Sequence, residues 1–156
     1  MPNVPAAKIN TLASQIYPPS FSGSQPYTTQ TGRLTRAIGE AFIDCNAFGL
    51  NTAFNNATRG YLFDICPGLH AQDVGYTFFN GETSDSLGLL IDAGAAGRVQ
   101  DWIVDFTILG DGSGSSVTQL PVYGSTGQVL RVPGFSSVQD PAKNQRCRFW
   151  LNDLTS

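Results

Sequence analysis

The sequence has little charge. Charged residues make up 13% of the 156 positions, against a usual share of roughly 25%. Nine Lys and Arg stand against twelve Asp and Glu, so the net charge is −3. Without a cluster of cations, binding to nucleic acid or to an anionic membrane surface is disfavoured. Hydrophobic residues make up 41%, the opposite of a disordered composition, so the chain is expected to bury a core and to expose apolar surface that a partner covers.

Several kinds of segment and site are also missing. No apolar run reaches the roughly 18 residues of a membrane-spanning helix, and the residues after Met1 lack the basic and apolar regions of a signal peptide. The three cysteines and the single histidine form no CxxC motif or Cys/His cluster, so we expect no metal site of that type and no cofactor. No serine lies in a G-x-S-x-G nucleophile elbow.

Hydrophobic spacing predicts two amphipathic helices. One covers residues 33–54, and its apolar residues are expected to face a core: Leu34, Ile38, Ala41, Phe42, Cys45, Phe48 and Phe54. The other covers residues 95–109, with Ala95, Val99, Trp102, Ile103, Phe106 and Leu109 on one face, and a flexible loop, Gly110–Ser116, ends it. Residues 1–32 are rich in Pro, Ser, Thr, Gln and Gly, which predicts a loop with one short helix near residues 6–15.

Two segments are typical of strands. Arg59–Cys66 is nearly continuously apolar up to Asp64, as in a buried parallel strand, and Gln128–Val132 is a second candidate. Helices on both sides of buried strands indicate an α/β fold. Two or three strands are too few for a sheet covered on both faces, because sheets usually have about 4–6 strands. Part of the sheet is therefore expected to be missing.

The residue of greatest chemical interest is His70, which directly follows the predicted buried strand. In open α/β sheets, ligands bind beyond the carboxyl ends of the strands, so His70 is placed to act as a general base. A loop histidine without a role fits the spacing as well. Asp73 either orients the imidazole or is merely solvated, and Asp64 is either a buried partner or a charge at the strand end. Asn56-Ala57-Thr58 is a glycosylation sequon and gives weak support for secretion.

Five motifs in order over most of the chain resemble the C-terminal third of the type B carboxylesterases, the group that includes fungal lipases and esterases and the cholinesterases. They are Ala41–Cys45, Tyr61–Phe63 followed by Pro67–Phe78, Trp102–Gly110, Leu120–Tyr123 and Arg146–Trp150. Two positions depart from the family pattern. Ala71 stands where glycine is common after the histidine, and Leu120 replaces a tryptophan.

The resemblance implies an incomplete α/β-hydrolase fold, with C-terminal strands and helices only. Residues 1–32 would be a loop-rich segment, and residues 33–156 the C-terminal part of the esterase domain. His70 matches the general base of a Ser-Glu/Asp-His triad, and Asp73 an acidic residue that supports it. Cys45 and Cys147 match a disulfide of the cholinesterases. Cys66 is then left over, either buried and unreactive or paired with something absent.

The same resemblance places the nucleophile, the oxyanion-hole glycines and the triad acid upstream of Met1. The chain is then expected to supply the histidine of a secreted carboxylic ester hydrolase and to be inactive alone. Its partners would be an ester substrate and the missing N-terminal part of the enzyme. Two alternatives are a non-catalytic interaction module or relict fragment, and a small stand-alone enzyme that uses His70 with Asp73 or Asp64. The sequence leaves open whether Met1 is the true start.

Overall fold

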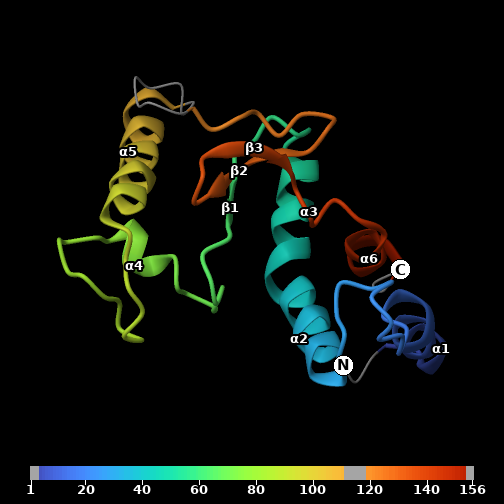
Figure 1. Cartoon of the computed structure of the whole chain (residues 1–156). Helices are drawn as coiled ribbons and strands as arrows, with labels where there is room; N and C mark the ends of the chain where they lie inside the picture. The colour runs from blue at the N-terminus through green and yellow to red at the C-terminus, as the bar shows by residue number, and fades with distance from the viewer. Residues whose placement is uncertain (1–3, 111–118, 154–156) are drawn as a thin grey trace. The chain divides into compact units, whose positions relative to one another are not determined.

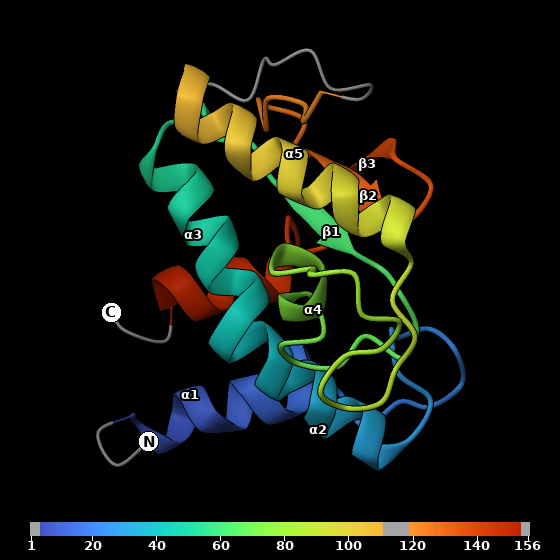
Figure 2. The ribbon, with the colours of Figure 1, turned by 90° about the vertical axis from the view of Figure 1, so that its left-hand side faces the viewer.

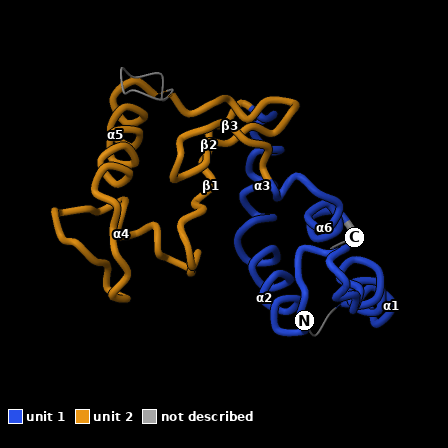
Figure 3. Tube along the Cα trace, in the orientation of Figure 1, with its two compact units in different colours: residues 1–56, 141–156 blue, residues 57–140 orange. Residues whose placement is uncertain are grey.

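The computed structural model describes residues 4–110 and 119–153 and divides into two compact units (Figure 3). Unit 1 consists of Met1–Asn56 together with Pro141–Ser156, and unit 2 of Ala57–Asp140. The chain therefore leaves unit 1, forms unit 2 and returns to unit 1. The predicted boundary between residues 32 and 33 stays a prediction.

Unit 1 is helical throughout its regular structure. Its longest feature is a continuous helical run, which confirms the helix predicted over residues 33–54 (Figure 1). Thr29 begins this run, since its side-chain oxygen accepts a hydrogen bond from the Gly32 N–H at 3.0 Å. The run consists of α2 (Gln30–Gly39), the π-helical η2 (Glu40–Asp44) and α3 (Cys45–Ala53). The other elements of unit 1 are α1 (Ala6–Thr11), η1 (Leu12–Ile16), α6 (Gln145–Arg148) and η3 (Phe149–Asp153).

The apolar stripe of this long helix is not the face that unit 1 buries. Leu34 is 59% exposed and Phe42 74% exposed, whereas Cys45 is 1% exposed. Ile38 and Phe54 are exposed as well. The predicted core-facing stripe is therefore wrong for most of its length. The buried side of the helix is instead the one that carries Glu40 and Cys45, because polar contacts and a disulfide hold other segments of unit 1 against it.

Unit 2 contains a small mixed sheet with the order β1-β2-β3. Its strands are β1 (Tyr61–Phe63), β2 (Gln128–Val132) and β3 (Ser136–Gln139). Strands β1 and β2 are parallel, with Tyr61 opposite Leu130, and β2 and β3 are antiparallel, with Val129 opposite Val138. The strand predicted at Gln128–Val132 is confirmed. A strand parallel to β2 is present within the predicted range 59–66, as expected. Its predicted length and burial are wrong, because β1 has three residues, lies at the sheet edge, and none of them is buried.

Two helices pack with the sheet of unit 2: α4 (Val74–Thr77) and α5 (Ala93–Leu109). Figure 2 shows α5 lying across the strands. The first half of α5 contributes Ala96, Val99 and Trp102 to a core that includes Leu130 and Val132. Beyond Trp102 the predicted core face is wrong, because the apolar side chains there are exposed: Ile103, Phe106 and Leu109.

The end of α5 follows the sequence prediction. Gly110 adopts a left-handed conformation with φ of 76° and closes the helix. The rest of the predicted loop, residues 111–116, lies outside the described residues. The described residues form helices and a small mixed sheet, which is a partial α/β architecture. Among these helices, none is long and apolar enough to cross a membrane.

Candidate functional site

The loop that carries His70 joins β1 to α4. It begins with a turn in which the Gly68 N–H donates to the Ile65 carbonyl at 2.8 Å, and Gly68 has a φ of 70°. His70 is exposed on the following turn. Within the described part of the chain, the imidazole makes no hydrogen bond or ion pair, so it is accessible to a group from outside. The two interpretations of His70, a general base and a loop residue without a role, stay predictions.

A buried glutamine holds this loop from beneath. Gln72 is 1% exposed, and its Oε1 accepts hydrogen bonds from the Gly68 and Leu69 N–H groups, each at 3.0 Å. Backbone N–H groups that are shielded from water need hydrogen-bond partners. By accepting from these two groups, Gln72 fixes the backbone just before His70. Sequence reasoning missed this residue, because a single glutamine in a polar loop carries no pattern that separates it from a solvated one.

Ala71 occupies a backbone conformation that suits glycine. Its φ is 66°, in the left-handed region. An L-residue pays roughly 1–2 kcal/mol there because its Cβ approaches a carbonyl oxygen. The residue directly after His70 is thus strained, at the position where the resembled family commonly has glycine.

Asp73 connects the histidine loop to the edge strand. Its Oδ2 accepts a hydrogen bond from the Tyr61 hydroxyl at 3.0 Å. Burial, then the Asp73 charge and this hydrogen bond, raise the pKa of Tyr61 to about 12. Among the described residues no bond joins Asp73 to His70, so the supporting role of Asp73 stays a prediction.

Two further candidate residues, Asp64 and Cys66, follow β1 in the sequence. Asp64 forms an ion pair with Arg131 at 2.5 Å, and the Asp64 side chain is 48% exposed. Of the two alternatives for Asp64, the strand-end charge is the one that the structure shows. Cys66 is a free and exposed thiol, so of its two alternatives burial is wrong, and pairing with something absent stays a prediction. The turn at Pro67 and Gly68 carries it to the surface instead of into a strand.

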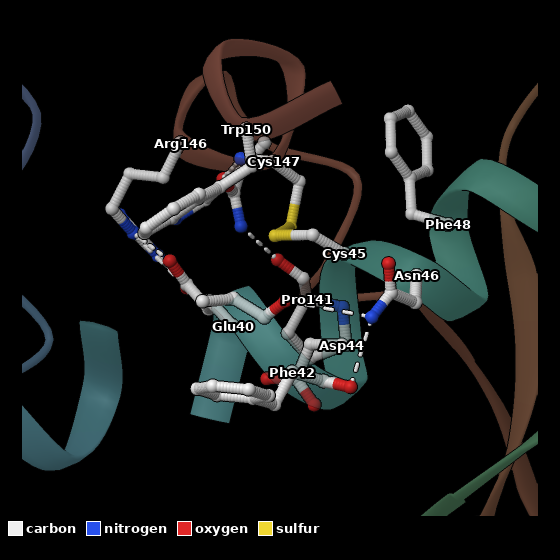
Figure 4. Close-up of a disulfide and its surroundings, with 12 residues drawn as sticks. Glu40, Phe42, Asp44, Cys45, Asn46, Phe48, Pro141, Arg146, Cys147 and Trp150 are labelled. Atoms are coloured by element: carbon white, nitrogen blue, oxygen red, sulfur yellow. Dashed lines mark hydrogen bonds and ion pairs between the residues drawn. A yellow bond between two sulfur atoms is a disulfide. The ribbon is translucent and has the colours of Figure 1, made fainter. Parts of the chain in front are cut away.

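The disulfide implied by the resemblance is present in unit 1 (Figure 4). Cys45 and Cys147 are bonded, with their Cα atoms 4.8 Å apart, and both are buried. The sequon residue Asn56 follows α3 with a φ of 58° and is partly buried. In the described ranges, 4–110 and 119–153, no group of three His, Cys, Asp or Glu side chains is arranged to hold a metal ion.

Comparison with known proteins gives two significant relatives, both fungal. The chain is 30% identical over 141 residues to carboxylesterase patB from Aspergillus clavatus, which covers 88% of this chain and 24% of that enzyme. It is 31% identical over 139 residues to carboxylesterase patB from Penicillium expansum, which covers 86% of this chain and 24% of that enzyme. No protein-family model matches the chain, and no solved structure matches it significantly. The chain thus spans about a quarter of the length of the curated relatives it matches, and over that quarter it is similar to a fungal carboxylesterase.

Proposed function

We propose that this chain supplies the histidine-bearing, C-terminal part of a type B carboxylic ester hydrolase with an α/β-hydrolase fold. The observation that carries the proposal is the similarity to two carboxylesterases over more than 85% of the chain. The placement of His70 supports it, because an exposed histidine follows a parallel strand on a loop with internal hydrogen bonds. In open α/β sheets, ligands bind beyond the carboxyl ends of the strands.

In the proposed reaction His70 acts as the general base. It takes the proton from a serine hydroxyl that attacks the ester carbonyl, and it returns the proton to the departing alcohol. The printed sequence holds no G-x-S-x-G elbow, so the serine would come from the portion of such an enzyme that this chain does not span. A base without a nucleophile beside it cannot carry out acyl transfer. We therefore expect the 156-residue chain alone to hydrolyse esters no faster than its His70→Ala variant.

A chimera tests the role of His70. The segment of Penicillium expansum carboxylesterase patB that matches this chain is replaced by this chain, and hydrolysis of nitrophenyl esters is measured. His70→Gln should lower kcat/KM at least about 100-fold, the lower range for loss of a general base. Leu69→Gln is the matched control, because Leu69 is the exposed neighbour of His70, and it should stay near the parent chimera. Equal activities of the two variants would remove His70 from the mechanism.

A second candidate is a non-catalytic, esterase-like interaction module. The observation that favours it is the row of exposed apolar side chains at Leu34, Ile38 and Phe42, each one turn apart on the long helix of unit 1. Large exposed apolar patches mark interaction surfaces. This candidate predicts concentration-dependent association of the chain and binding of an apolar dye. A monomer at every concentration that binds no dye would exclude it.

The proposed location is extracellular. A disulfide between Cys45 and Cys147 persists in oxidising compartments and is rare in the cytosol. A fungal host that exports the chain behind a secretion signal gives the test. The purified chain should carry the 45–147 bond, and Asn56→Gln should abolish any shift in mass that a glycosidase produces. A reduced, unmodified product with intact folding would count against secretion.

A further inference from the structure

A buried charge lies beside the disulfide of unit 1. Glu40 is 1% exposed, and Arg146 binds both of its carboxylate oxygens, with Nε at 2.8 and 3.0 Å and Nη2 at 2.7 Å. The Tyr17 hydroxyl donates to Glu40 Oε2 at 2.6 Å, and Trp150 Nε1 donates to the Tyr17 oxygen at 2.8 Å. A carboxylate this deeply buried is tolerated only with a charged and hydrogen-bonded partner. The pair therefore fixes the C-terminal segment against the long helix.

The ionic pair and the disulfide join the same two segments side by side (Figure 4). Arg146 and Cys147 are neighbours in α6, and Glu40 and Cys45 are the first residue and the C-cap of η2. In an α-helix, residues five apart diverge by about 140° around the axis. Here the Cys45 N–H bonds the Glu40 carbonyl in a wider π-helical turn, which brings the two side chains closer to one face.

The length of the chain alone favours a different disulfide. Cys45 and Cys66 are 21 positions apart, whereas Cys45 and Cys147 are 102 apart. Because the probability of loop closure falls with about the 3/2 power of loop length, the shorter loop is favoured about tenfold in a flexible chain. In the folded chain Cys66 is nevertheless a free, exposed thiol. An interaction that brings α6 to the long helix before oxidation would offset this preference for the shorter loop.

We propose that the Glu40–Arg146 pair is a pairing guide: it docks α6 on the long helix before oxidation and so selects Cys147 over Cys66 as the partner of Cys45. In each oxidation two protein thiols become one disulfide, and one glutathione disulfide is reduced to two glutathione thiols. The Asn144 side chain assists, because it accepts a hydrogen bond from the Cys147 N–H at 3.0 Å and orders the first turn of α6. This inference does not depend on the proposed ester hydrolysis.

Oxidative refolding tests the guide. The reduced, unfolded 156-residue chain is refolded in a glutathione buffer, trapped at successive times by alkylation, and mapped by peptide mass. The parent should form mainly the 45–147 bond. Glu40→Gln should raise the early ratio of 45–66 to 45–147 bonds several-fold. Arg36→Gln is the matched control: Arg36 Nε lies 3.9 Å from the same carboxylate but on the same helix, so it cannot orient α6 and should leave the ratio unchanged.

A second variant separates guidance from loss of folding. In the Cys66→Ser background the competing partner is absent, so Glu40→Gln should again give the 45–147 bond in the yield of Cys66→Ser alone. The proposal is overturned if Glu40→Gln pairs its cysteines as the parent does. It is equally overturned if the double variant cannot form the bond, because the pair would then be needed for folding as such and not for the choice of partner.

Discussion

At the scale of single residues, the conformation of the histidine loop depends on side chains that flank His70. Gln72 pairs two backbone N–H groups beneath the loop, Tyr61 anchors Asp73 to the edge strand, and Ala71 takes a left-handed conformation. The sequence allowed the position of His70 after a strand to be predicted. It did not allow Gln72 or Tyr61 to be assigned, because hydrogen bonds of single polar side chains leave no periodic signal.

Replacement of Ala71 by glycine should stabilise the chain. Removal of the Cβ relieves the roughly 1–2 kcal/mol cost of the left-handed conformation, and the greater freedom of glycine in the unfolded chain cancels about 0.5–1 kcal/mol of it. We expect denaturant unfolding to show a net gain of about 0.5–1 kcal/mol. Ala47→Gly is the matched control, because Ala47 is exposed within α3 and should lose about 1 kcal/mol. A less stable Ala71→Gly variant would contradict the prediction.

The pKa of Tyr61 is raised to about 12 from an ordinary value of 10.0. The free energy of unfolding should therefore vary with pH in the alkaline range. The folded chain keeps the phenol proton at a pH where the unfolded chain loses it. This contribution is therefore fully present below pH 10 and is lost as the pH rises towards 12. NMR titration of labelled tyrosine rings, with Tyr61→Phe to assign the signal, measures the pKa directly.

The same titration checks the cause. Asp73→Asn removes the carboxylate charge beside the phenol, so the pKa of Tyr61 should move down, while burial still holds it above its ordinary value. Asp64→Asn is the control, because Asp64 pairs with Arg131 and not with Tyr61. An unchanged pKa of Tyr61 in Asp73→Asn would show that the Asp73 charge does not contribute.

At the scale of elements, the sequence predicts where helices form better than it predicts which of their faces are buried. Apolar spacing predicts the runs at residues 30–53 and 93–109, and Gly110 is the predicted end of the second run. Which face of a helix is buried depends on segments far away in the sequence. Apolar spacing therefore predicts Leu34 and Phe42 in a core, although both are exposed. Strand β3 was missed because Ser136–Gln139 has little apolar alternation, and it forms by pairing with β2.

The start of α5 offers a quantitative check of local sequence logic. The Asp92 side chain accepts a hydrogen bond from the Ala95 N–H at 3.1 Å and caps the helix. Asp92→Ala should cost about 1 kcal/mol of unfolding free energy, the usual loss of an N-cap. Asp101→Ala removes the same charge from an exposed position inside α5 and should stay within about 0.5 kcal/mol of the parent. Equal losses would mean that charge and not capping matters at Asp92.

At the scale of the whole molecule, unit 2 lies within the loop of sequence that the disulfide closes. Cys45 and Cys147 both belong to unit 1, and Ala57–Asp140 lies between them. Such a bond stabilises chiefly by restricting the unfolded chain, and a loop of about 100 residues corresponds to roughly 4.7 kcal/mol in the simplest model. If unit 2 stays folded while unit 1 unfolds, the enclosed loop is already partly fixed, and the stabilisation is smaller.

Reduction of the disulfide should therefore act mainly on unit 1. The two tryptophans report separately: Trp150 belongs to unit 1 and Trp102 to the core of unit 2. Trp102→Phe leaves Trp150 as the fluorescent probe of unit 1, and Trp150→Phe leaves Trp102 as the probe of unit 2, so each substitution lies outside the unit that is measured. Under reducing conditions the Trp150 transition should move to lower denaturant concentration by an amount equivalent to several kcal/mol, below the roughly 4.7 kcal/mol limit, while the Trp102 transition stays in place. Coincident shifts of both probes would mean that the two units unfold as one cooperative body, and the full loop would then set the loss.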